Sequence, residues 1–213
     1  MKKHSLKPAS AVLLYLCLWQ SAVAAMPPTI LVMGDSLSAA YGIDSERGWV
    51  SLLARRLGER GHDFRVVNAS ISGETSEGGL SRLPDALNQY TPALVILELG
   101  ANDGLRGINP TVLRSNVERM IELTQQHDAK VLLTGVRIPA NYGEAFRERY
   151  YAVYETVARD TGIPLVPFLL DRVAQDPALM QPDGLHPTAK AQPMILDNVW
   201  PKLKLLIKGV PAP

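Results

Sequence analysis

Leu94-Val95-Ile96-Leu97 is the stretch of this sequence that decides the fold, because four consecutive positions are apolar. A strand with one solvated face alternates polar and apolar residues, whereas a strand covered on both faces does not. The stretch therefore predicts a strand that is buried on both faces. We expect this strand to span Leu94–Leu99, and other β-rich runs predict further strands at Ile30–Met33, Phe64–Asn68, Lys130–Thr134 and Leu165–Val166.

Helical patterns lie between these predicted strands. The expected helices are Trp49–Arg60, Pro110–Gln126, Ala145–Asp160, and a last helix from near Pro187 to Lys208 in which Pro193 and Pro201 are candidate break points. Strands that alternate with helices indicate βαβ units and a mostly parallel sheet, so the fold class is α/β. In such sheets the ligand lies beyond the carboxyl ends of the strands, where the chemistry is therefore expected.

The first residues of the chain have the three parts of a signal peptide. Three lysines precede an apolar run from Ala11 to Trp19, and Ala22-Val23-Ala24 is a small-x-small cleavage signal. We expect cleavage of residues 1–24, leaving residues 25–213 as a single domain that is periplasmic or secreted. The alternative is an uncleaved membrane anchor, although the apolar run is short for a membrane span. Cleavage also removes Cys17, the only cysteine, so the mature chain has no disulfide or thiol nucleophile.

Composition and charge limit the classes of function. The hydrophobic share of 46% and the charged share of 20% are those of an ordinary globular protein. A formal net charge of +1 gives no reason to expect a nucleic-acid partner. We expect a monomer that acts on a small molecule and keeps no membrane anchor after cleavage.

Four short polar motifs stand after predicted strands, at the edge where a ligand is expected. They are Gly34-Asp35-Ser36-Leu37-Ser38, Ser72-Gly73-Glu74, Gly100-Ala101-Asn102-Asp103 and Asp183-Gly184-Leu185-His186. Ser36 is a candidate nucleophile at a strand-to-helix turn, where backbone N–H groups are free to bind an oxyanion. The alternative for Ser36 is an ordinary helix N-cap.

The spacing of Asp183 and His186 favours a catalytic base. Asp183 stands three residues before His186 in a short loop, so its carboxylate can reach one ring nitrogen while the other faces a hydroxyl. A structural Asp–His contact within the loop is the alternative. Gly73 and Asn102 could supply oxyanion donors, or they could be a turn glycine and an Asx turn.

At these four motifs the sequence resembles the GDSL, or SGNH, hydrolases, whose second name denotes a Ser, Gly, Asn and His from four blocks. Here the four are Ser36, Gly73, Asn102 and His186, in the family's order and spacing. Within the family the chain looks like the exported multifunctional esterases of Gram-negative bacteria, which include thioesterase, lysophospholipase and arylesterase activities. The resemblance implies a flavodoxin-like three-layer α/β/α fold with a five-stranded parallel sheet. It also implies a triad of Ser36, Asp183 and His186 and an oxyanion hole of Ser36, Gly73 and Asn102. We expect no metal or other cofactor.

Two segments could bind the acyl group of an ester, thioester or lysophospholipid. Glu74–Gly79 is flexible by composition and begins beside Gly73, and 137–143 follows the fourth strand. In the second segment we expect Ile138, Pro139 and Tyr142 to line an apolar acyl site. An ordinary surface loop is the alternative.

Two other functions compete with a serine hydrolase. A metal-dependent phosphoesterase could draw its ligands from Asp35, Asn102, Asp103, Asp183 and His186, although two-metal sites commonly use several histidines. A non-catalytic binding module could keep the same fold. Sensitivity to a chelator distinguishes the first alternative, and a covalent adduct on Ser36 from a fluorophosphonate argues against the second.

Overall fold

A computed structural model of the chain describes residues 26–210, and the expected signal peptide, residues 1–24, lies outside them. One sheet contains five strands, which are β1 (Thr29–Gly34), β2 (Arg65–Asn68), β3 (Leu94–Glu98), β4 (Lys130–Thr134) and β5 (Leu165–Val166). Their order is β2-β1-β3-β4-β5, and every neighbouring pair is parallel. The prediction of a five-stranded parallel sheet is therefore confirmed.

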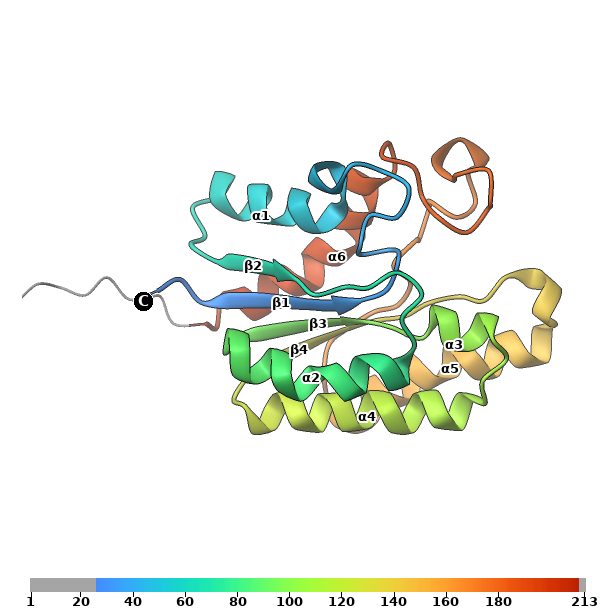
Figure 1. Ribbon diagram of the computed structural model, residues 1–213, viewed down its shortest axis with the longest axis horizontal. Helices are drawn as coiled ribbons and strands as arrows, with labels where there is room; N and C mark the ends of the chain where they lie inside the picture. Colours follow the sequence, from blue (N-terminus) through green and yellow to red (C-terminus); the bar gives the residue numbers. More distant parts are fainter. Residues whose placement is uncertain (1–25, 211–213) are drawn as a thin grey trace, which may run out of the picture.

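Helices cover both faces of the sheet (Figure 1). One face packs against α1 (Trp49–Glu59) and α6 (Gln192–Ile207), and the other against α2 (Ser76–Tyr90), α4 (Pro110–Gln126) and α5 (Glu144–Thr161). Along β1, Ile30 and Val32 belong to the first core and Leu31 and Met33 to the second. The strand is apolar throughout because successive side chains enter different cores. This is the three-layer α/β/α fold that the resemblance implied.

The last helix begins later than predicted. Residues 187–191 form a loop, in which Thr188 N donates to Leu179 O and Pro187 forms a bridge with Met180. The helix starts at Gln192, so Pro193 lies in its first turn, where a missing N–H leaves no helical bond unmade. Pro201 lies inside α6 and does not end it, because the apolar side chains beyond it are buried in the core.

The segment Glu74–Gly79 is not the flexible loop that its composition suggested. Thr75 caps α2 by accepting a hydrogen bond from Gly78 N, and α2 starts at Ser76. Two glycines and Pro84 weaken the helical signal in the sequence. Packing overrides this propensity: a Cβ on Gly79 would clash with Leu99 Cδ1, so the glycine lets the helix approach the sheet closely.

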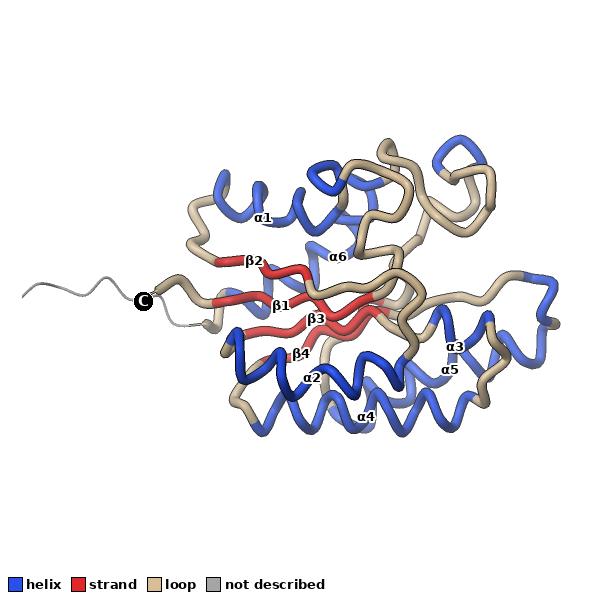
Figure 2. Tube along the Cα trace, in the orientation of Figure 1, coloured by secondary structure: helices blue, strands red, loops and turns tan. Residues whose placement is uncertain are grey.

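The loops that follow the strands gather at the carboxyl edge of the sheet, at the right of Figure 2. They include the short helix α3 (Ala101–Leu105) and the 3₁₀ turns η1 (Ser45–Arg47), η2 (Ala140–Tyr142) and η3 (Pro177–Leu179). Among the described helices, none combines the length and the apolar character that crossing a membrane needs.

Candidate active site

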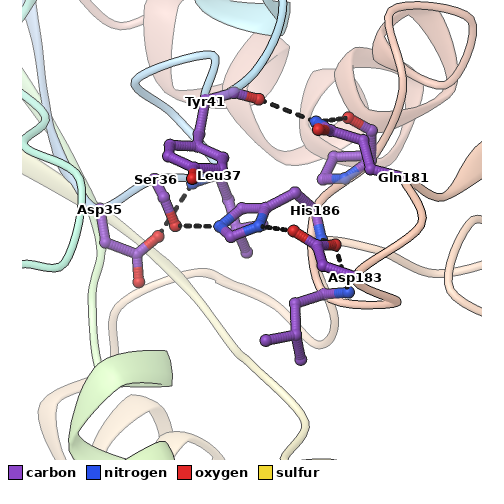
Figure 3. Close-up of polar contacts among 9 residues, drawn as sticks. Asp35, Ser36, Leu37, Tyr41, Gln181, Asp183 and His186 are labelled. Atoms are coloured by element: carbon purple, nitrogen blue, oxygen red, sulfur yellow. Dashed lines mark hydrogen bonds and ion pairs between the residues drawn. The ribbon is translucent and has the colours of Figure 1, made fainter.

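Ser36, His186 and Asp183 form one continuous chain of contacts (Figure 3). His186 Nε2 lies 2.8 Å from Ser36 Oγ, and His186 Nδ1 lies 2.7 Å from Asp183 Oδ2. Ser36 and His186 are 150 residues apart in the chain. A ring whose Nδ1–H donates to a carboxylate presents an unprotonated Nε2 to a hydroxyl, which is the arrangement that removes a proton from serine.

The loop that carries His186 also fixes the carboxylate of Asp183. Its second oxygen, Oδ1, accepts hydrogen bonds from Leu185 N at 2.9 Å and His186 N at 3.0 Å. The hydrogen bond from the His186 ring, together with these two backbone bonds, lowers the pKa of Asp183 to about 2. The carboxylate is therefore ionised throughout the neutral range and held in one orientation toward the ring.

The turn after β1 presents Ser36 between two buried neighbours. Asp35 Oδ1 accepts from Leu37 N at 3.0 Å, and Ala39 N donates to Asp35 O. Asp35 and Leu37 are buried while Ser36 is partly exposed. Gly34 allows this tight turn, because a Cβ there would come within 2.8 Å of a Glu98 carboxylate oxygen and of the Ser38 hydroxyl.

Asn102 and Gly73 stand on neighbouring loops of the same edge. Asn102 lies in the first turn of α3, and its Nδ2 donates to Asp35 Oδ2 at 3.1 Å. Gly100, before it, has φ +117, and a Cβ there would clash with the Tyr154 hydroxyl. Gly73 has φ +82, and its carbonyl accepts from Arg106 Nη2 at 2.9 Å. Both predicted donors thus have defined positions.

Two carboxyl groups lie buried behind the nucleophile. Glu98 Oε2 accepts from Ser38 Oγ at 2.7 Å and from Asp35 N at 3.3 Å, while Glu98 Oε1 has no partner. Desolvation, and then the nearby Asp35, raise the pKa of Glu98 well above its usual value. Desolvation also raises the pKa of Asp35 to about 6, against its hydrogen bonds from Leu37 and Asn102. Burial therefore disfavours the charged form of both carboxyl groups.

A cavity of about 510 Å³ opens beside Ser36 and His186. Ile138 and Pro139, two of the three residues predicted for an acyl site, line it. Tyr142 does not line it: its hydroxyl donates to Leu105 O at 2.8 Å, which supports the wall from behind. The segment Glu74–Gly79 is also absent from the lining, because those residues begin α2.

Several residues of the cavity wall were not predicted. Phe168, Leu169 and Leu170 line it, and so do Leu105 and Met180. The first three come just after β5, separated from it by Pro167, so an apolar run at the carboxyl edge was the available signal. Met180 gave no such signal, because it lies in the irregular segment before α6. Between residues 26 and 210, no three His, Cys, Asp or Glu side chains are grouped so that they could hold a metal ion.

The family model for GDSL-like lipase/acylhydrolases matches residues 32–192. The chain is 52% identical to an esterase, TesA, from Pseudomonas aeruginosa, covering 84% of this chain and 89% of that protein. It is 45% identical to an arylesterase from Vibrio mimicus, over 91% of this chain and 96% of that protein. It is 41% identical to the thioesterase 1/protease 1/lysophospholipase L1 of Escherichia coli, over 86% of this chain and 87% of that protein.

Comparison with solved structures points to the same family. A crystal structure of TesA matches with a TM-score of 0.82 at 52% identity, covering 84% of this chain and 99% of that one. The chain therefore belongs to the GDSL-like lipase/acylhydrolase family, as the four motifs indicated. It is a carboxylic ester hydrolase, which confirms the class of enzyme predicted from the sequence.

Proposed function

We propose that the chain hydrolyses carboxylic esters and thioesters through an acyl-enzyme on Ser36. The observation that supports this most directly is the line of contacts from Asp183 through His186 to Ser36 at the mouth of the cavity. The names of the relatives, which include esterase, arylesterase and thioesterase/lysophospholipase, point to the same chemistry.

In the first half-reaction Ser36 Oγ attacks the carbonyl carbon of the substrate while its proton moves to His186 Nε2. The carboxylate of Asp183 stabilises the imidazolium that forms. His186 then gives this proton to the leaving alcohol or thiol as its bond to carbon breaks. General acid–base help of this kind contributes roughly 10²–10⁴ in rate.

Backbone N–H groups of Ser36 and Gly73 and the side-chain amide of Asn102 would bind the oxyanion. Nδ2 has two hydrogens, and one of them is donated to Asp35. The other is left to face the developing charge, so Asp35 acts as a positioning residue for Asn102. Removing one donor of this kind costs roughly 10²–10³ in turnover.

The cavity is the proposed site for the acyl group. Its wall is largely apolar, and Ile138 is itself buried next to it. We expect Ile138→Asn to weaken hydrolysis of long-chain p-nitrophenyl esters more than that of the acetate, because only long chains reach this wall. An equal loss on both substrates would show that the cavity does not hold the acyl chain.

We further propose that residues 1–24, outside the described part of the chain, are a cleaved signal peptide. Residues 25–213 would then act as one domain, as a monomer, in the periplasm or outside the cell. Mass spectrometry of the exported protein should give a chain that starts at Ala25, and size-exclusion chromatography should give the mass of one chain. A retained residue 1 would indicate a membrane anchor instead.

The central experiment compares Ser36→Ala with wild type on p-nitrophenyl esters and acyl thioesters, with and without a chelator. Ser115→Ala is the matched control, because Ser115 is an exposed serine on α4. We expect activity and fluorophosphonate labelling in wild type and in the control, neither in Ser36→Ala, and no effect of the chelator. Chelator-sensitive activity without labelling would favour a metal-dependent phosphoesterase, and a folded but inert wild type would favour a binding module.

A further inference from the structure

Tyr41 occupies a position that neither the core nor the triad explains. Its ring centroid lies 4.3 Å from that of His186, with 37° between the two planes. The side chain is 51% exposed and belongs to neither core cluster. Figure 3 shows the ring of Tyr41 beside the contact between Ser36 and His186.

The backbone that carries this exposed ring is held by contacts with the His186 loop. Gln181 Nε2 donates to Tyr41 O at 2.8 Å and to Pro187 O at 3.1 Å, which ties the Tyr41 loop to the loop of His186. Ala40, directly before it, has φ +60, a conformation that non-glycine residues seldom adopt. A large aromatic side chain that stands beside a reactive histidine and is half exposed to water is suited to contact a ligand.

The stereochemistry of the reaction leaves one substrate group for this surface. The tetrahedral carbon carries Ser36 Oγ, the oxyanion, the acyl group and the leaving oxygen. The oxyanion is directed to the donors at Gly73 and Asn102, and the acyl group to the cavity. The leaving oxygen takes its proton from His186 Nε2, so the alcohol part of the ester lies next to the His186 ring. Tyr41 is the aromatic side chain beside that ring.

Two other exposed apolar residues lie near site residues in the chain. Leu185 is 38% exposed and lines the acyl cavity. Ile71 is 47% exposed and lies two residues before Gly73. Tyr41 contacts His186 but does not line the cavity.

We propose that Tyr41 forms the leaving-group subsite and selects esters of aromatic alcohols by stacking on their rings. This inference rests on the proposed function. The step it assists is acylation: Ser36 Oγ bonds to the carbonyl carbon, the carbon–oxygen bond to the aryl group breaks, and the phenol leaves with the serine proton that His186 carried. Deacylation is not affected, because the phenol has gone.

The test compares two butyrate esters that form the same acyl-enzyme. Phenyl butyrate has an aromatic leaving group, and hexafluoroisopropyl butyrate has an alcohol of similar acidity without a ring. Because only acylation involves the leaving group, kcat/KM is measured for both esters on wild type, Tyr41→Phe, Tyr41→Leu and Tyr41→Ala. Leu205→Ala removes another exposed apolar side chain, 63% exposed on α6, and is the control. Titration with a fluorophosphonate gives the concentration of active sites in each preparation, and kcat/KM is expressed per active site.

We expect the ratio of phenyl to hexafluoroisopropyl kcat/KM to fall about two- to tenfold in Tyr41→Leu and Tyr41→Ala, the range of one aromatic contact. Tyr41→Phe and Leu205→Ala should keep the wild-type ratio. An equal loss on both esters would mean that Tyr41 only steadies His186, and an unchanged ratio would also overturn the proposal. A wild type that hydrolyses neither ester would instead refute the proposed function.

Discussion

Replacing Asp35 by Asn should stabilise the protein at neutral pH while slowing its reaction. Burial raises the pKa of Asp35 from 3.8 to about 6. Between these values the folded protein holds a proton that the unfolded chain has released, so the free energy of unfolding of wild type falls as pH rises. At about 1.4 kcal/mol per pH unit, the rise of the Asp35 pKa from 3.8 to about 6 costs wild type about 3 kcal/mol by pH 7.

The Asp35→Asn variant avoids this cost because its amide does not ionise. The side-chain oxygen of the amide can still accept from Leu37 N, but its NH₂ group would face Asn102 Nδ2, another donor. The lost hydrogen bond costs about 1 kcal/mol. The variant should therefore unfold with about 2 kcal/mol more free energy than wild type at pH 7, and this advantage should disappear as pH falls from 6 to 4.

The same substitution should reduce kcat. Asn102 loses the acceptor that orients its amide, and a misplaced oxyanion donor costs up to roughly 10²–10³ in turnover. Urea unfolding at pH 4 to 8, with p-nitrophenyl butyrate kinetics at pH 7, measures both effects. Asp85→Asn, at an exposed position on α2, controls for the loss of one carboxylate. A stability difference between the Asp35→Asn variant and wild type that does not change with pH would refute the reasoning.

Three further outcomes are expected. Asp183→Asn should lower kcat by roughly 10⁴, because a neutral amide can hold the ring in the wrong tautomer; a loss below tenfold in steady-state kinetics would contradict this role. The pKa of Asp183 is lowered to about 2, so the ionised Asp183 stabilises the fold fully above pH 3.8, and this stabilisation is lost as pH falls toward 2. The Asp183→Asn variant should therefore be less stable than wild type above pH 3.8, and its stability should depend less on pH between 3.8 and 2 in acid-unfolding experiments. Gly100→Ala should destabilise the fold by about 1–3 kcal/mol in urea unfolding, because φ is +117 and the new Cβ would meet the Tyr154 hydroxyl, whereas Gly58→Ala, in open space on α1, should not destabilise it.

Much of the fold followed from local patterns. The continuous apolar run at β3 predicted a doubly covered strand, and each of the five strands lies within about one residue of its expected position. The helix α2 was missed because Gly78, Gly79 and Pro84 are weak helix formers, and only close packing against Leu99 explains why a glycine is needed there. The start of α6 was placed too early because the contact between Thr188 and Leu179 does not show in the sequence pattern.

The candidate site was likewise predictable from the sequence in part. The motifs that carry Ser36 and Asn102 were recognisable because they directly follow β1 and β3, and those of Gly73 and His186 because they are short polar turns between predicted elements. Of the three predicted acyl-site residues, Ile138 and Pro139 line the cavity while Tyr142 supports it through Leu105. A sequence shows that a tyrosine is apolar and close to the edge, but not which way its ring turns.

The sequence by itself determined the alternation of strands and helices and the polar turns at the strand ends, because hydrophobic period and turn chemistry act over a few residues. Only the tertiary structure decided which of these turns meet. It placed Ser36 2.8 Å from a histidine 150 residues away, buried Asp35 beside Glu98, and set Tyr41 against the His186 ring. These arrangements depend on strand order and on packing across the sheet, since they join loops whose neighbours in space are remote in the chain.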